Sequence, residues 1–140
     1  MSKEITKFRI YIPKTIHRNY YEIFVFKTYK DMYEYYRNTG GYQDTDFIAI
    51  CRDMDIYKGY IPKSKIGEIL ITKKDCKMGI ITHECGHMAF QVIRRQMKES
   101  MWTIKDYKWE GEEFYCYFLG EFSRKFVNSL YKYGILKGGK

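Results

Sequence analysis

Four short apolar segments in the N-terminal part of the chain predict β-strands. Phe8–Ile12 alternates large apolar residues with others and stops at Pro13, a pattern that is typical of a strand. Glu22–Thr28 is rich in β-branched and aromatic residues, which favour strands. Asp46–Cys51 is expected to be a buried strand and Gly67–Thr72 a further one, with an irregular loop between them.

One early segment and most of the second half of the chain predict helices. Asp31–Arg37 is expected to form a short helix that ends at the glycines of positions 40 and 41. Residues 75–97 predict a long helix with Asp75 as its cap, and residues 111–133 predict a second one that ends at Gly134. The order β, β, α, β, β, α, α indicates an α+β fold: a small mixed, mostly antiparallel sheet with one short helix, packed on two long helices.

The composition is that of a folded domain. Of the 140 residues, 45% are hydrophobic and 19% are aromatic, which favours an ordered globule over a disordered chain. A chain of this length is expected to form one domain, residues 1–140. The net charge of +8 permits attraction to nucleic acid, but the basic residues are scattered along the chain, so a solvated basic surface is the preferred interpretation.

Cysteine usage and hydropathy bear on the compartment and on the kinds of metal site. The four cysteines form no C-x-x-C pair, which excludes a zinc ribbon of the usual spacing. Cys85 and Cys116 are predicted to be small buried packing residues rather than metal ligands. The opening residues do not resemble a signal peptide, and no apolar run approaches the roughly 20 residues that span a bilayer. We therefore expect a cytoplasmic protein with free thiols and no membrane partner.

The clearest chemical signal is the H-E-x-x-H segment His83-Glu84-Cys85-Gly86-His87. Residues four apart lie on the same face of a helix, so His83 and His87 are expected to present two imidazoles to one metal ion. Glu84 is then close enough to act as a general base on a water molecule beside the metal. The pattern predicts a zinc hydrolase. The alternative is that the two histidines are solvated or packed residues of an amphipathic helix, with no metal.

A catalytic zinc site needs a third protein ligand, and the acidic cluster Glu110-Gly111-Glu112-Glu113 is the best source of one. It follows the motif at a distance that allows the first long helix to end and an antiparallel helix to present a carboxylate. The third histidine of the chain, His17, stands in no recognisable motif and is not expected to be a ligand. The remaining alternative is that these glutamates only complement the positive end of the helix dipole.

The phase of the final helix selects among these glutamates. Its predicted apolar band consists of Phe114, Phe118, Phe122, Phe126 and Leu130. Glu113 lies on the neighbouring stripe with Gly120, where a missing side chain is expected to allow close approach of the other long helix. Glu113 is therefore the predicted third ligand, and Glu112 is the alternative.

With this arrangement, the chain resembles the gluzincin class of H-E-x-x-H zinc metallopeptidases. More narrowly, the segments Gly67–Lys73, Gly79–Ala89 and Glu112–Gly120 resemble small phage- and plasmid-encoded metallopeptidases. The resemblance covers about residues 65–125. It implies a minimal zincin-like domain in which Gly67–Thr72 is the edge strand that holds an extended peptide by backbone pairing. The second motif of thermolysin-like enzymes, N-E-x-x-x-D, is absent, because Tyr117 stands four residues after Glu113.

The motif and the resemblance together predict a zinc-dependent peptidase that acts on a peptide or protein substrate. Zn²⁺ would be held by His83, His87 and Glu113, with Glu84 as the general base. Tyr117 is a candidate for stabilising the oxyanion. The alternative function is that of a zinc-binding phage or plasmid protein, not necessarily catalytic, that binds a host protein or nucleic acid. A phage-encoded protein of either kind would act in the host cytoplasm.

Overall fold

The computed structural model describes residues 5–13, 18–41, 47–53, 65–99 and 111–137, with their side chains except those of 95–99 and 111–112. The elements in these ranges are, in order, β1 (Ile5–Tyr11), β2 (Tyr20–Phe26), α1 (Tyr29–Asn38), β3 (Ala49–Asp53), β4 (Lys65–Thr72), the 3-10 helix η1 (Lys73–Asp75), α2 (Met78–Glu99) and α3 (Gly111–Lys132). The predicted α+β fold is confirmed, with the ends of the elements shifted by a few residues.

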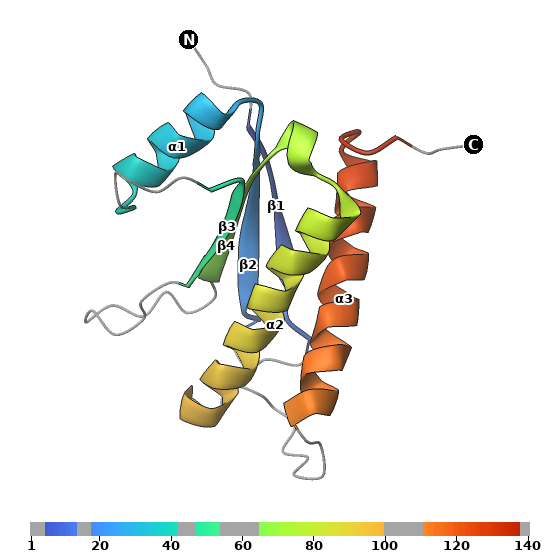
Figure 1. The fold of residues 1–140 in the computed structure, drawn as a ribbon. Helices are drawn as coiled ribbons and strands as arrows, with labels where there is room; N and C mark the ends of the chain where they lie inside the picture. Colours follow the sequence, from blue (N-terminus) through green and yellow to red (C-terminus); the bar gives the residue numbers. More distant parts are fainter. Residues whose placement is uncertain (1–4, 14–17, 42–46, 54–64, 100–110, 138–140) are drawn as a thin grey trace.

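The four strands form one mixed sheet in the order β1-β2-β4-β3. β1 pairs antiparallel with β2, β2 pairs parallel with β4, and β3 pairs antiparallel with β4. Figure 1 shows α2 and α3 side by side along the sheet, with α1 set apart from them. In the described part of the chain, none of the helices is long and apolar enough to cross a membrane.

The two faces of β2 show how the sheet is covered on both sides. Successive side chains of a strand point to opposite faces. Tyr21, Ile23 and Val25 join the large core cluster under α2 and α3, whereas Phe24 and Phe26 join a smaller cluster under α1. Phe118, Phe122, Phe126 and Leu130 of α3 are buried in the large cluster, with Phe114 packed against it, which confirms the predicted apolar band.

Three local predictions were wrong. β4 lies inside the sheet and not at its edge, because β3 pairs along its outer side. β3 is accordingly a half-buried edge strand and not a buried one. Asp75 does not cap α2: it is buried in η1, where it accepts hydrogen bonds from the hydroxyls of Thr72 and Tyr29.

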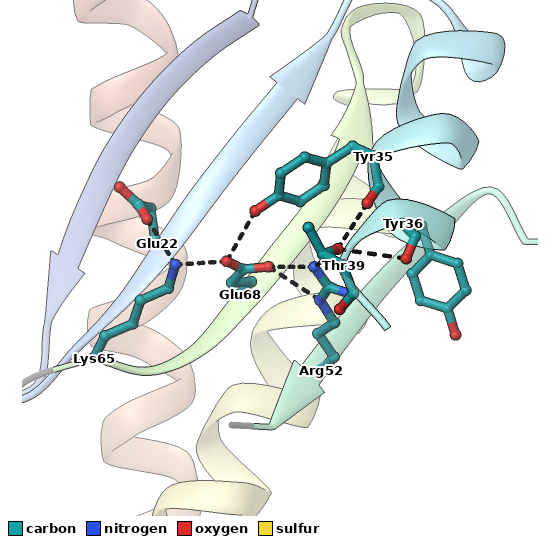
Figure 2. A network of polar contacts seen from close by, with 7 residues as sticks. All are labelled: Glu22, Tyr35, Tyr36, Thr39, Arg52, Lys65 and Glu68. Atoms are coloured by element: carbon teal, nitrogen blue, oxygen red, sulfur yellow. Dashed lines mark hydrogen bonds and ion pairs between the residues drawn. The ribbon is translucent and has the colours of Figure 1, made fainter. Parts of the chain in front are cut away.

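On the α1 side of the sheet, the buried carboxylate of Glu68 is the centre of a polar network (Figure 2). Arg52 on β3 donates two hydrogen bonds to Glu68 Oε1, at 2.7 and 3.0 Å. Lys65 donates to Glu68 Oε2 at 2.5 Å and to Glu22 at 2.8 Å, and the Tyr35 hydroxyl of α1 also donates to Glu68. This network ties the edge strand β3 to β4 and α1.

We expect Glu68→Gln to lower the free energy of unfolding by about 1–3 kcal/mol near neutral pH. This loss is smaller than that for breaking a fully buried ion pair, because the Arg52 and Lys65 side chains are partly exposed to water. Burial raises the pKa of Glu68, but hydrogen bonds from Lys65 and Arg52 outweigh it and hold the pKa below its usual range. The stabilisation is therefore complete above the unfolded pKa of about 4.3 and is lost as the pH falls through the folded pKa.

Urea unfolding at several pH values measures this effect. The stability of the variant should fall less steeply in acid than that of the wild type, because Gln does not titrate. The matched control is Glu121→Gln, which breaks an exposed pair with Arg124 and should cost about 0–1 kcal/mol. Equal acid sensitivity of the wild type and Glu68→Gln would show that the network does not set the pH dependence.

Candidate metal centre

Helix α2 brings His83 and His87 together on its outer face. Its opposite side is held against the core by a run of buried residues at helical spacing: Ile81, Cys85, Met88, Ala89 and Val92. This anchoring leaves both histidines exposed. Their Nε2 atoms lie 3.1 Å apart, and the rings meet edge to face. The two imidazoles therefore converge on one point, as the i, i+4 spacing predicts.

A cavity of about 590 Å³ opens at the two histidines. It is lined by Thr82, His83, Gly86, His87 and Phe90 of α2 and by Tyr115 and Leu119 of α3. Sequence reasoning missed the contributions of Phe90, Tyr115 and Leu119. The signal for Phe90 was its place three residues after His87, where a helix returns to the same face; its side chain is 61% exposed. Tyr115 and Leu119 had no such signal in the sequence, because they line the cavity only through the packing of α3 against α2.

Glu84 lies beside the histidines, on the flank of α2 that faces β3. Its side chain is buried, with 4% of the residue exposed, and its Oε1 atom has no hydrogen-bond partner among the described residues. Burial raises the pKa of Glu84, against a smaller lowering by His83. Burial also lowers the pKa of His87, with the neighbouring His83 acting in the same direction, which favours the neutral imidazole that binds metals.

The strand beside this flank of α2 is β3, whereas the sequence predicted that it would be β4. Gln91, seven residues after Glu84 and so on the same face of α2, accepts hydrogen bonds from Cys51 of β3 at 3.7 Å and from Tyr21 of β2 at 2.5 Å. The bond from Cys51 to Gln91 therefore places β3 against this flank of α2. Burial raises the pKa of Cys51 strongly, and the charge of Glu84 adds to that rise. The edge strand available next to the motif is therefore Ala49–Asp53.

No third ligand joins the histidines among the residues that the structure describes, since no group of three His, Cys, Asp or Glu side chains gathers there. Glu113 is exposed. The stripe on which it was predicted to face α2 points to solvent instead: Glu113, Cys116, Tyr117, Gly120 and Arg124 are all exposed. The side chain of Glu112 and the whole of His17 lie outside the described residues.

The close contact between the long helices involves a different glycine from the predicted one. A Cβ atom on Gly120 would meet nothing within 4 Å, whereas one on Gly86 would lie 3.1 Å from the Tyr115 hydroxyl. The prediction of burial is confirmed for Cys85 and is wrong for Cys116, which is exposed. Cys85 packs in the core, on the opposite side of α2 from the histidines.

A comparison of the chain with protein-family models, with curated proteins and with solved structures found no match. What this site does is therefore inferred from its own geometry and chemistry.

Proposed function

We propose that this protein is a zinc-dependent peptidase built on a minimal zincin-like domain. The observation that carries the proposal is the 3.1 Å separation of the Nε2 atoms of His83 and His87. Two nitrogens bound to one tetrahedral zinc at 2.0–2.1 Å are about 3.3 Å apart, so the pair fits a single ion with little movement. Without a metal, the same distance is that of an N–H···N hydrogen bond.

The second support for a metal centre is the environment of Glu84. A buried carboxylate oxygen without a partner is costly, and proteins retain such groups mainly where they have a function. When bound, zinc would polarise a carbonyl group and lower the pKa of a water molecule. Glu84 would accept the proton of the attacking water and deliver it to the leaving amine. Desolvation suits this role, because it raises the pKa of Glu84 toward the working pH.

Helical phase favours Glu112 over Glu113 as the third ligand. Tyr115 and Leu119 are the residues of α3 that line the cavity at the histidines. Position 112 precedes them by three and seven residues, so it lies within about 20° of Leu119 around the helix axis. Position 113 lies about 120° away from Leu119. We therefore propose Glu112 as the ligand, with Glu113 as the alternative.

The position of the tyrosines also changes the candidate for oxyanion stabilisation. Tyr117 is exposed and its ring packs edge to face on Phe118, whereas Tyr115 lines the cavity beside the histidines. A hydroxyl at Tyr115 is the better placed donor for a developing oxyanion.

A zinc-binding module without catalytic activity is the second candidate. The observation in its favour is that only two metal-binding side chains meet among the described residues. Such a protein would bind a partner through the same scaffold, and it would not need Glu84 as a base.

Metal content tests the proposal directly. Protein purified with zinc available should carry about one zinc per chain by elemental analysis, and His83→Ala should lose it. Because the metal would tie α2 to α3, a chelator should also lower the melting temperature of the wild type and leave that of His83→Ala unchanged. Metal-free wild-type protein that is indifferent to zinc and to chelator would rule out the metal centre.

A further inference from the structure

Two groups of lysines that are far apart in the sequence, five residues in all, come together at the end of the sheet from which α1 and α2 begin. β2 and β4 run parallel and end in register at the pair Phe26 and Thr72. Adjacent strands lie about 4.8 Å apart, so Lys27 and Lys73 leave the sheet as neighbours. Lys30 in the first turn of α1, Lys74 in η1 and Lys77 just before α2 complete the group. All five side chains are exposed, and we refer to them as the lysine surface.

Contacts within the described residues hold the two parts of the lysine surface together. The Tyr29 hydroxyl of α1 donates a hydrogen bond to Asp75 of η1. The Lys74 ammonium lies 4.4 Å from the centre of the Tyr29 ring. Thr72 donates to the same Asp75 carboxylate at 2.9 Å, so the turn after β4 is fixed against the start of α1.

The local charge is strongly positive. Residues 27–31 and 73–77 contain five lysines and two aspartates, so these ten residues carry +3 of the chain's net +8. Asp75 is buried and already bonded to Tyr29 and Thr72.

The start of α2 adds to this positive charge. The first turn of the helix has no acidic residue, and Lys77 precedes it, with its carbonyl accepting the hydrogen bond from the Ile81 N–H. A lysine at the positive end of a helix opposes the dipole, so this arrangement works against helix stability and in favour of binding an anion.

We propose that the lysine surface binds the phosphate backbone of double-stranded DNA without sequence preference. Lysine is a point charge suited to phosphate, and residues 27–31 and 73–77 contain no arginine of the kind that reads guanine in the major groove.

Two other polyanions fit this surface less well. Single strands are bound by stacking on aromatic rings, but the Tyr29 ring is covered by Lys74 and stacked on Tyr33. A membrane site would present several apolar side chains. Of the exposed large apolar residues in the described part of the chain, only Met78 directly adjoins one of these lysines in the sequence.

The test compares two triple variants of equal charge. Lys30→Gln/Lys73→Gln/Lys77→Gln removes charge from the lysine surface, and Lys74 is kept because it packs on Tyr29. Arg37→Gln/Arg94→Gln/Arg124→Gln removes three exposed arginines elsewhere, on α1, α2 and α3. Binding to a short fluorescein-labelled DNA duplex is measured by anisotropy over a range of salt concentrations. Circular dichroism establishes that both variants are folded.

The wild type should bind the duplex with a micromolar-range Kd that weakens with salt, as expected for phosphate contacts. The lysine variant should bind at least about tenfold more weakly. The slope of its log binding constant against log salt concentration should be smaller in magnitude by about 2–3, as expected for the loss of three phosphate contacts. The arginine variant should stay within about threefold of the wild type. Equal weakening in both variants would overturn the proposal, because net charge alone would then explain binding. Binding of phosphatidylserine vesicles through the same lysines, with no binding of the duplex, would overturn it in favour of a membrane surface.

Discussion

In the proposed zinc peptidase, Glu84→Gln is expected to lower the rate of peptide hydrolysis strongly while leaving zinc content and folding intact. Gln preserves the size and shape of the side chain but cannot accept a proton, so turnover should fall by about 10²–10⁴, the usual contribution of a general base. Stability should be retained or slightly raised, because Glu84 is a buried carboxylate with an unpartnered oxygen, and a neutral amide is less costly to bury. Cleavage of a quenched fluorescent peptide library measures turnover, with elemental analysis and thermal unfolding alongside.

The matched control is Glu121→Gln, the same substitution on α3 at a side chain paired with Arg124. It should keep wild-type turnover. A Glu84→Gln variant that cleaves at the wild-type rate would remove Glu84 from the mechanism. If Glu84→Gln instead retains the biological effect of the protein in cells while cleaving nothing, the zinc-binding module is the better account.

The second large effect is expected at the third ligand. Glu112→Gln should lower the affinity for zinc. The loss should exceed the roughly 10–100-fold that is typical when a residue that only orients a metal ligand is removed. Glu113→Gln should change zinc affinity little, because Glu113 is exposed and lies on a different face of α3 from Tyr115 and Leu119, which line the cavity. Competition with a zinc-sensitive dye measures both affinities, and His87→Ala provides the reference for the loss of a ligand.

The two glutamates are adjacent, carry the same charge and lie in the same turn of α3, so each serves as the control for the other. The opposite pattern, with zinc lost in Glu113→Gln alone, would restore the ligand predicted from the sequence. Unchanged affinity in both single variants and in the double variant would mean that neither glutamate binds zinc, and the site would then have to be completed from elsewhere.

Local sequence patterns were sufficient for the secondary structure. Period-2 and continuous apolar segments located the strands, and period-3.6 segments located α2 and α3. The final helix ends as predicted, with Gly134 just beyond it at a φ of 76°. Asp75 was misassigned because a carboxylate just before a helix is typical of a cap. Here Tyr29, distant in the sequence, donates a hydrogen bond to it, and Asp75 is buried in η1.

The order of strands in the sheet required the tertiary structure. The pattern of Gly67–Thr72 is that of an apolar strand, but an apolar strand can lie at the centre of a sheet or beneath covering loops at its edge. Pairing between β3 and β4 joins two separate segments of the chain, and the hydropathy of either segment alone does not specify its partner. That pairing places β3, and not β4, against the flank of α2 that carries Glu84.

The sequence by itself determined the convergence of His83 and His87, because residues four apart lie on the same face of a helix in any tertiary environment. It also determined the apolar band of α3, because burial follows helical period. Only the tertiary structure decided which stripe of α3 faces α2. The stripe of Tyr115 and Leu119 does so and that of Glu113 and Gly120 is exposed, because the period of one helix does not fix the position of its neighbour. The lysine surface was decided in the same way: its residues are far apart in the chain, and parallel pairing of β2 and β4 brings them to one end of the sheet.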